Sequence, residues 1–224
     1  MDAPETLSRP EEDPREALVR RLETLLPGQN LRALAQRERV TFERAGQRNK
    51  GWVGQTIERV AGLDGGSAAR PDGGDYELKT TTLIRDGDRW KPKETIKVTM
   101  LNPQTILDEE LEQSLLWRKL ARLVVVGVEH RPDGTAEAVR IRAFDTRDPE
   151  LVDGVRAYWE ELRRTVAEGA LPDVIGSHGT SEGWLQLRGT GTGRESSHCP
   201  ITGRAFPSQA FYATKRFVRR MLAL

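Results

Sequence analysis

The most chemically suggestive segment of the chain is Pro-Asp-Gly-Gly-Asp-Tyr-Glu-Leu-Lys at residues 71–79. The carboxylates of Asp72 and Glu77, brought together by a turn and a strand, would form the hard oxygen site that Mg²⁺ prefers. Lys79 stands two residues after Glu77, so on a strand both side chains project from the same face. There an ammonium group can orient or help deprotonate an attacking water, or stabilise a pentavalent phosphate, while a metal neutralises charge. The segment therefore indicates metal-dependent phosphoryl chemistry.

The elements that must position these residues follow from the spacing of apolar side chains. Helical spacing predicts helices near residues 18–26, 31–35, 51–62, 107–120 and 155–169. Alternation, or an unbroken apolar run, predicts strands near 75–80, 95–101, 123–128, 136–144 and 184–188. A basic helix is expected over 209–224. Helices flanking a mixed central sheet is the simplest architecture that uses these pieces, so the predicted fold class is α/β.

Composition favours a soluble globular protein without a membrane partner. The 224 residues are 37% hydrophobic and 31% charged, enough for one sizeable core or two modest lobes. No segment approaches the roughly 20 apolar residues of a membrane span, and the N-terminus lacks the layout of a secretory signal. We therefore expect a cytoplasmic location. Cys199 is the only cysteine, which excludes an internal disulfide.

Charge is distributed unevenly, although the formal net charge is only +1. Residues 1–15 are rich in acid and proline and are predicted to form a flexible leader. Nothing acidic follows Glu195, and the tail could face a phosphate backbone if its cations share one surface. The tail's cations are Arg204, Lys215, Arg216, Arg219 and Arg220.

Two further motifs make the segment at 71–79 more specific. Asn-Lys-Gly-Trp-Val-Gly-Gln-Thr-Ile-Glu at 49–58, followed about twenty residues later by Tyr-Glu-Leu-Lys-Thr at 76–80, resembles the MutH family of DNA mismatch-repair endonucleases. That family includes related type II restriction endonucleases and belongs to the PD-(D/E)xK nucleases. Weaker matches follow in order at 118–120, 184–188 and 211–217. The resemblance implies a restriction-endonuclease-like core over residues 16–224, split into two lobes around a DNA cleft.

Carried over residue by residue, the resemblance implies five residues of a catalytic centre. Asp72 and Glu77 would be metal ligands, Lys79 the catalytic lysine, Glu58 an accessory carboxylate and Lys119 a phosphate contact.

The first metal ligand has an alternative, because the spacing from Asp72 to Glu77 is two residues shorter than in the family. Asp75 shares the strand face of Glu77 and could substitute. A metal site needs ligands that converge from turn and strand, and the preceding Pro71 favours Asp72.

DNA contacts are implied in the same way. Arg188 would read guanine in the major groove, and Tyr212 would contact an adenine edge or test its methylation. Lys50, Lys215 and Arg216 are expected to contact DNA as well. The family's basic residue shortly after the arginine is replaced here within residues 189–193, which leaves the recognition sequence and methyl sensitivity open.

The resemblance implies an Mg²⁺-dependent, sequence-specific endonuclease acting on double-stranded DNA, with Mn²⁺ expected to substitute. The preferred interpretation is the strand-nicking enzyme of mismatch repair, recruited by a MutL-like partner. One alternative is a restriction endonuclease that cuts both strands. An alternative of another class is a DNA-binding module without catalysis.

Overall fold

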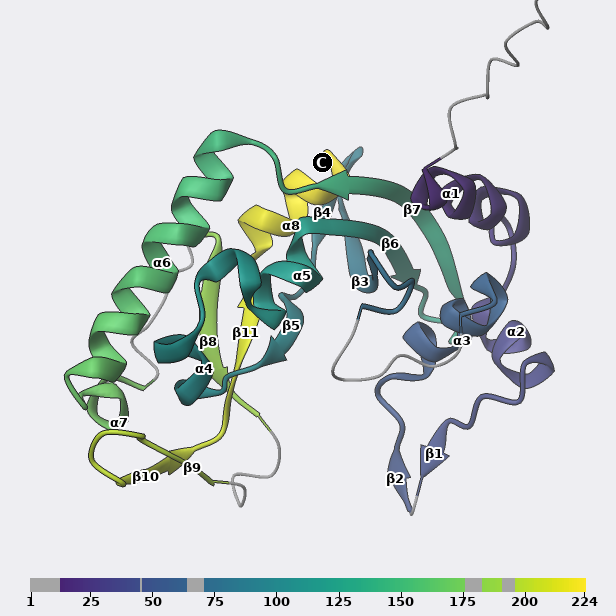
Figure 1. Ribbon diagram of the computed structural model, residues 1–224. Coiled ribbons are helices and arrows are strands. Elements are labelled where there is room, and N and C mark those ends of the chain that lie inside the picture. Colours follow the sequence, from purple (N-terminus) through teal and green to yellow (C-terminus); the bar gives the residue numbers. More distant parts are fainter. Residues whose placement is uncertain (1–12, 45, 64–70, 176–182, 191–195) are drawn as a thin grey trace, which may run out of the picture.

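The computed structural model describes residues 13–44, 46–63, 71–175, 183–190 and 196–224 (Figure 1). Its elements are α1 (Pro14–Leu25), α2 (Leu31–Arg37), β1 (Glu43–Arg44), β2 (Gln47–Arg48), α3 (Trp52–Ala61), β3 (Glu77–Asp86), β4 (Arg89–Pro92), β5 (Ile96–Met100), α4 (Pro103–Asp108), η1 (Leu111–Gln113), α5 (Leu115–Ala121), β6 (Arg122–His130), β7 (Ala136–Asp145), α6 (Pro149–Ala167), α7 (Leu171–Val174), β8 (Leu185–Gly189), β9 (Ser196–His198), β10 (Ala205–Pro207), β11 (Gln209–Ala213) and α8 (Lys215–Leu222). None of the helices within these described ranges is long and apolar enough to cross a membrane.

A four-stranded mixed sheet, in the order β4-β3-β6-β7, forms the centre of the fold. β3 and β6 run parallel, with Glu77 paired to Leu123, whereas β4 and β7 are antiparallel to their neighbours. β6 is the predicted apolar strand, and it is buried from Leu123 to Val128 because both faces of the sheet are covered. A second sheet, in the order β5-β11-β8, is antiparallel throughout.

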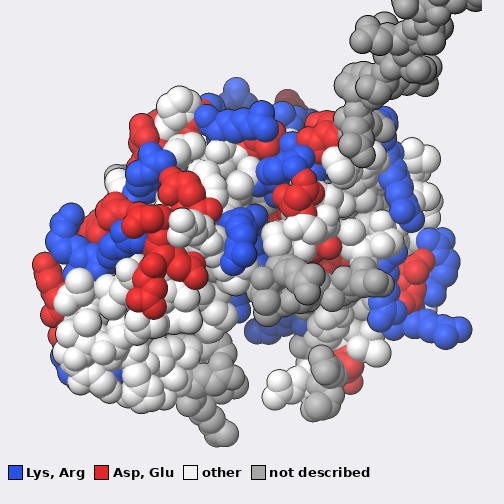
Figure 2. Space-filling view, viewed as in Figure 1, with Lys and Arg blue, Asp and Glu red and all other residues white. Residues whose placement is uncertain are grey.

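Two hydrophobic clusters lie on opposite faces of the mixed sheet. Leu78 and Val124 belong to the cluster formed with α1, α2 and α3. Leu83 and Val125 belong to the cluster that includes α5, α6, α8 and the second sheet. In Figure 1 the two groups of elements lie on the right and left of the view, and Figure 2 shows the same face hollowed at its lower edge between them. The predicted mixed sheet flanked by helices is confirmed.

The N-terminal boundary of the fold differs from the prediction. The predicted leader extends to residue 15, but α1 already begins at Pro14. The Asp13 carboxylate caps this helix by accepting from the Arg15 backbone N–H at 2.9 Å. Arg15 is only 3% exposed. Residues 1–12 lie outside the described residues.

Two predicted helices are interrupted in the structure. The segment 107–120 is divided among α4, η1 and α5, since Glu109 and Glu110 are extended and Ser114 caps a new helix by accepting from the Trp117 N–H at 3.1 Å. Over 209–224, residues 209–213 form the central strand β11 of the second sheet, and the helix begins only after Thr214. In both places a capping residue restarts the helix.

Several strands were not predicted: β4 of the central sheet and the short strands β1, β2, β9 and β10. The turn at Gly87 and Asp88 separates β3 from β4, and the two strands pair antiparallel from Leu83–Pro92 to Asp86–Arg89. The strand predicted at 95–101 is β5, which joins the second sheet instead of continuing this hairpin.

Candidate active site

A tight loop over residues 71–76 carries Asp72 back toward the first residue of β3. The Gly73 N–H donates to the Tyr76 carbonyl at 2.9 Å, and the Gly74 N–H donates to the Pro71 carbonyl at 3.2 Å. Gly74 has φ +84°, a conformation that favours glycine. A Cβ on Gly73 would lie 2.1 Å from the Tyr76 ring, so this position also requires glycine.

The loop brings Asp72 against Glu77. The Asp72 backbone N–H donates to Glu77 Oε2 at 3.2 Å, and the Leu78 N–H donates to Asp72 Oδ2 at 3.1 Å. Glu77 is only 1% exposed. Asp75, the alternative ligand, is instead held by the Arg122 guanidinium. The geometry therefore favours Asp72 over Asp75 as the partner of Glu77.

Two ammonium groups from different elements meet at one oxygen of Glu77. Lys79 Nζ lies 2.5 Å and Lys119 Nζ 3.0 Å from Glu77 Oε1. Lys79 comes from the same strand face, as the period of two predicts. Lys119 arrives on the last turn of α5, directly before β6, and the parallel pairing of β6 with β3 brings the starts of both strands together. The Lys119 side chain is 8% exposed and that of Lys79 is 22% exposed.

Glu58 adds a third carboxylate from α3. Its pKa is raised by burial and by the negative charges of Asp72 and Glu77, and lowered in part by Lys79. α3 approaches β3 closely at Gly54, where an added Cβ would lie 3.6 Å from Thr80 Oγ1 and 3.9 Å from Glu58 Oε1. Glu58 therefore acts electrostatically on the same cluster.

The pKa of Asp72 is raised as well. Burial is the main cause and the Glu77 charge the second, while Lys79, the Leu78 N–H and Lys119 lower it. Burial thus disfavours the charged form of both carboxyl groups despite the nearby lysines, and a cation bound among them would favour that form.

The donor set fits Mg²⁺ held by Asp72 and Glu77. Both supply carboxylate oxygens, and Mg²⁺ is commonly bound through one or two carboxylates while it keeps several waters. Within the described part of the chain, no three His, Cys, Asp or Glu side chains are grouped to hold a metal by themselves. A two-carboxylate site with water ligands is consistent with that arrangement.

The predicted DNA-reading residues lie together on the second sheet. Arg188 on β8 and Tyr212 on β11 stand on adjacent strands, and the Arg188 guanidinium carbon lies 5.3 Å from the centre of the Tyr212 ring. Arg188 Nη1 also donates to Thr95 Oγ1 at 3.0 Å. This contact between Arg188 and Thr95 spans 93 residues, so no local pattern in the sequence could indicate it.

The other predicted DNA contacts are dispersed. Lys50 precedes α3 and lines a cavity of about 390 Å³ together with Gly54, Thr80 and His130. Lys215 and Arg216 begin α8, where Arg216 pairs with Glu150 at 2.6 Å. The Arg216 guanidinium also lies 4.0 Å from the Trp184 ring centre. The structure thus joins Arg216 to the start of α6 and to Trp184, not to the carboxylates around Glu77.

Charges of both signs are mixed over the face that presents α6 (Figure 2). Several of the tail's cations are paired: Arg204 with Asp173, Arg216 with Glu150 and Arg220 with Asp148. The uneven charge seen along the sequence is therefore partly balanced by tertiary contacts.

Comparison with known proteins yields one family. A family model described as "DNA mismatch repair enzyme MutH" matches residues 62–153, a segment that contains Asp72, Glu77, Lys79 and Lys119. The "DNA mismatch repair protein MutH" of Shewanella sp. strain W3-18-1 and that of Shewanella putrefaciens strain CN-32 are each 32% identical over 183 residues, covering 78% of this chain and 78% of the relative. The protein of the same name from Shewanella amazonensis is 34% identical over 148 residues, 63% of this chain and 62% of the relative.

Among solved structures, the chain aligns with a complex of the restriction endonuclease MvaI and its cognate DNA substrate. The TM-score is 0.36 at 9% sequence identity, with 85% of this chain and 95% of the other covered.

Proposed function

The chain belongs to the MutH family of DNA mismatch-repair enzymes, and we propose that it is a metal-dependent DNA endonuclease whose active site is built on Asp72, Glu77 and Lys79. The proposal depends on one observation, the convergence of Asp72, Lys79 and Lys119 on the Glu77 carboxylate. A carboxylate that is 1% exposed has Asp72 on one oxygen and two lysine ammonium groups on the other. Such a cluster of buried charges costs folding energy, so its presence in this chain points to catalysis.

Each residue of the cluster has a distinct role in the proposal. Asp72 and Glu77 would hold Mg²⁺, for which Mn²⁺ would substitute, and the ion would lower the pKa of a bound water and neutralise phosphate charge. Lys79, the more exposed of the two lysines, would orient the attacking water and stabilise the charge that develops on the phosphate. Lys119 would fix the Glu77 carboxylate and contact the phosphate. Glu58 would act as an accessory carboxylate.

The substrate in this proposal is double-stranded DNA, cut in one strand after recruitment by a MutL-like protein in the cytoplasm. The three relatives named above are all DNA mismatch repair proteins, which supports this interpretation. Arg188 and Tyr212 would read base edges from adjacent strands, because a guanidinium beside an aromatic ring is held in a defined orientation.

Cleavage of supercoiled plasmid of defined methylation state, with Mg²⁺, Mn²⁺ or EDTA, tests the proposal. We expect slow nicking by the wild type with either metal, no cleavage in EDTA, and a loss of at least about 100-fold in Glu77→Gln and Lys79→Ala. Lys91→Ala is the matched control, since Lys91 is a half-exposed lysine on β4 that pairs with Asp86 at 3.0 Å, away from Glu77.

Two outcomes would change the proposal. If Lys79→Ala binds DNA normally and cleaves at the wild-type rate, the catalytic role of this lysine is wrong. Prompt linearisation by the wild type would identify a restriction endonuclease instead of a nicking enzyme.

A further inference from the structure

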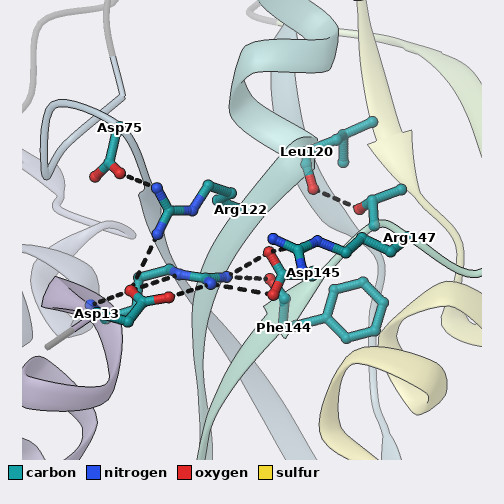
Figure 3. Close-up of polar contacts among 9 residues, drawn as sticks. Asp13, Asp75, Leu120, Arg122, Phe144, Asp145 and Arg147 are labelled. Carbon is teal, nitrogen blue, oxygen red and sulfur yellow. Dashed lines mark hydrogen bonds and ion pairs between the residues drawn. The ribbon is translucent and has the colours of Figure 1, made fainter. Parts of the chain in front are cut away.

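Arg122 connects the loop that carries Asp72 to the N-terminus of α1. It is the first residue of β6 and follows Lys119 by three positions. Its Nη1 donates to Asp75 Oδ2, and its Nη2 donates to Asp13 Oδ1 at 3.0 Å. Figure 3 shows the guanidinium lying between the two carboxylates.

The Asp13 side of this bridge is firmly anchored. Asp13 accepts from Arg15 Nη2 at 2.6 Å and from Arg15 Nε at 3.1 Å, and this hydrogen bonding holds the pKa of Asp13 well below its usual range. Arg15 in turn binds both oxygens of Asp145, at 2.8 and 3.0 Å, and the Phe144 carbonyl at 3.1 Å. The Arg15 side chain is 4% exposed. Paired hydrogen bonds between guanidinium and carboxylate fix orientation as well as distance, so α1 and the end of β7 form a rigid base.

The backbone between Lys119 and Arg122 is anchored too. The Thr146 N–H donates to the Ala121 carbonyl at 3.0 Å. Thr146 Oγ1 donates to the Leu120 carbonyl at 2.5 Å, and Figure 3 shows that carbonyl with its dashed hydrogen bond. The start of β6 therefore has a fixed position relative to Asp145.

The loop itself has few restraints by comparison. Two backbone hydrogen bonds close it, and the Asp75 side chain is 51% exposed. An ion pair this exposed contributes little to global stability. Its effect would instead be local, because Asp75 lies in the same loop as Asp72, three residues further along the chain.

We propose that Arg122 is a positioning residue of the active site, which holds the Asp72 carboxylate in place through Asp75 against the base formed by Asp13, Arg15 and Asp145. The proposal rests on the proposed function, in which Asp72 and Glu77 are metal ligands. Asp75, the alternative metal ligand, would then support the metal site through Arg122 without binding the ion itself.

The test measures Mn²⁺ binding without DNA, by electron paramagnetic resonance of free Mn²⁺, beside cleavage kinetics. Loss of a residue that orients a metal ligand typically weakens metal binding by about 10- to 100-fold. We expect such a loss in Arg122→Gln and in Asp75→Asn, and no further loss in the double variant, because both remove one interaction. Arg122→Lys should recover part of the Mn²⁺ affinity. In Arg122→Gln and Asp75→Asn, KM for DNA should stay unchanged and kcat at limiting metal should fall. Arg147→Gln is the matched control, since Arg147 is 80% exposed and reaches Asp145 only at 3.8 Å.

The outcomes separate this proposal from the proposed function. If Arg122→Gln and Asp75→Asn bind Mn²⁺ as the wild type does, while Glu77→Gln loses binding and cleavage, Arg122 has no positioning role and the nuclease assignment stands. If the wild type neither binds Mn²⁺ nor cleaves DNA, both proposals are wrong. Asp75→Asn, at an exposed side chain, keeps the test valid should Arg122→Gln fold poorly.

Discussion

Replacing Lys119 by methionine tests whether the buried charges around Glu77 are balanced as the structure indicates. The Lys119 and Glu77 side chains are 8% and 1% exposed, and removing one partner of such a buried pair costs about 3–5 kcal/mol. Lys79 remains 2.5 Å from the same oxygen of Glu77, so we expect the lower value, about 3 kcal/mol. For a domain of this size, each kcal/mol corresponds to about 2–4 °C, which gives a fall in Tm of about 6–12 °C in EDTA.

Metal should reverse part of this loss. In the proposed site the Lys119 ammonium would compete with the ion for Glu77, so its removal should tighten Mg²⁺ binding. Mg²⁺ at about 100 times its Kd stabilises a protein by about 2.7 kcal/mol. Differential scanning calorimetry in EDTA and in Mg²⁺ would therefore show a larger metal-induced rise in Tm for Lys119→Met than for the wild type.

The matched control is Arg118→Met, an exposed neighbour on the same helix, whose effect should stay within about 0.5 kcal/mol. The reasoning is refuted if Lys119→Met melts within 2 °C of the wild type in EDTA, or if Mg²⁺ raises its Tm no more than it raises that of the wild type.

Three further perturbations have defined outcomes. Gly73→Ala should destabilise the protein by about 1–3 kcal/mol and reduce cleavage, because its Cβ would lie 2.1 Å from the Tyr76 ring and displace the loop; equal Tm and equal rate would contradict this. Arg188→Gln should lower the preference for the cognate base at one position by about 1–3 kcal/mol, seen by sequencing cleaved ends from a mixed substrate, whereas unchanged specificity would exclude base reading by this residue. Asp13→Asn should cost stability at pH 7. Because hydrogen bonding to Arg15 lowers the pKa of Asp13, its contribution is full above the unfolded pKa of about 3.9 and is lost as pH falls further, so urea unfolding should show a deficit that shrinks below about pH 4. A deficit independent of pH would contradict this reasoning, because asparagine still caps the helix and only the carboxylate charge titrates.

Local patterns were sufficient for several elements. The unbroken apolar run of β6 and the helical spacing of α1, α3 and α6 predicted those elements, because burial on both faces or on one stripe leaves a direct periodicity. Alternation along β3 likewise predicted that Glu77 and Lys79 share a face, and the two side chains are 2.5 Å apart.

Local patterns failed where a short element depends on distant partners. Residues 209–213 are a strand because β5 and β8 pair with them on both edges, although the following sequence favours a helix. Likewise, 107–120 is interrupted where Arg163 of α6 binds the carbonyls of Ile106 and Glu109.

The sequence by itself determined the family, the kinds of residue at the proposed site and the shared face of Glu77 and Lys79, because motifs and a period of two are local properties. Only the tertiary structure decided that Lys119 meets Glu77 across 42 residues and that Arg122 meets Asp75 across 47 residues and Asp13 across 109. These contacts depend on the parallel register of β3 and β6 and on the docking of α1, and nothing in the local sequence encodes either.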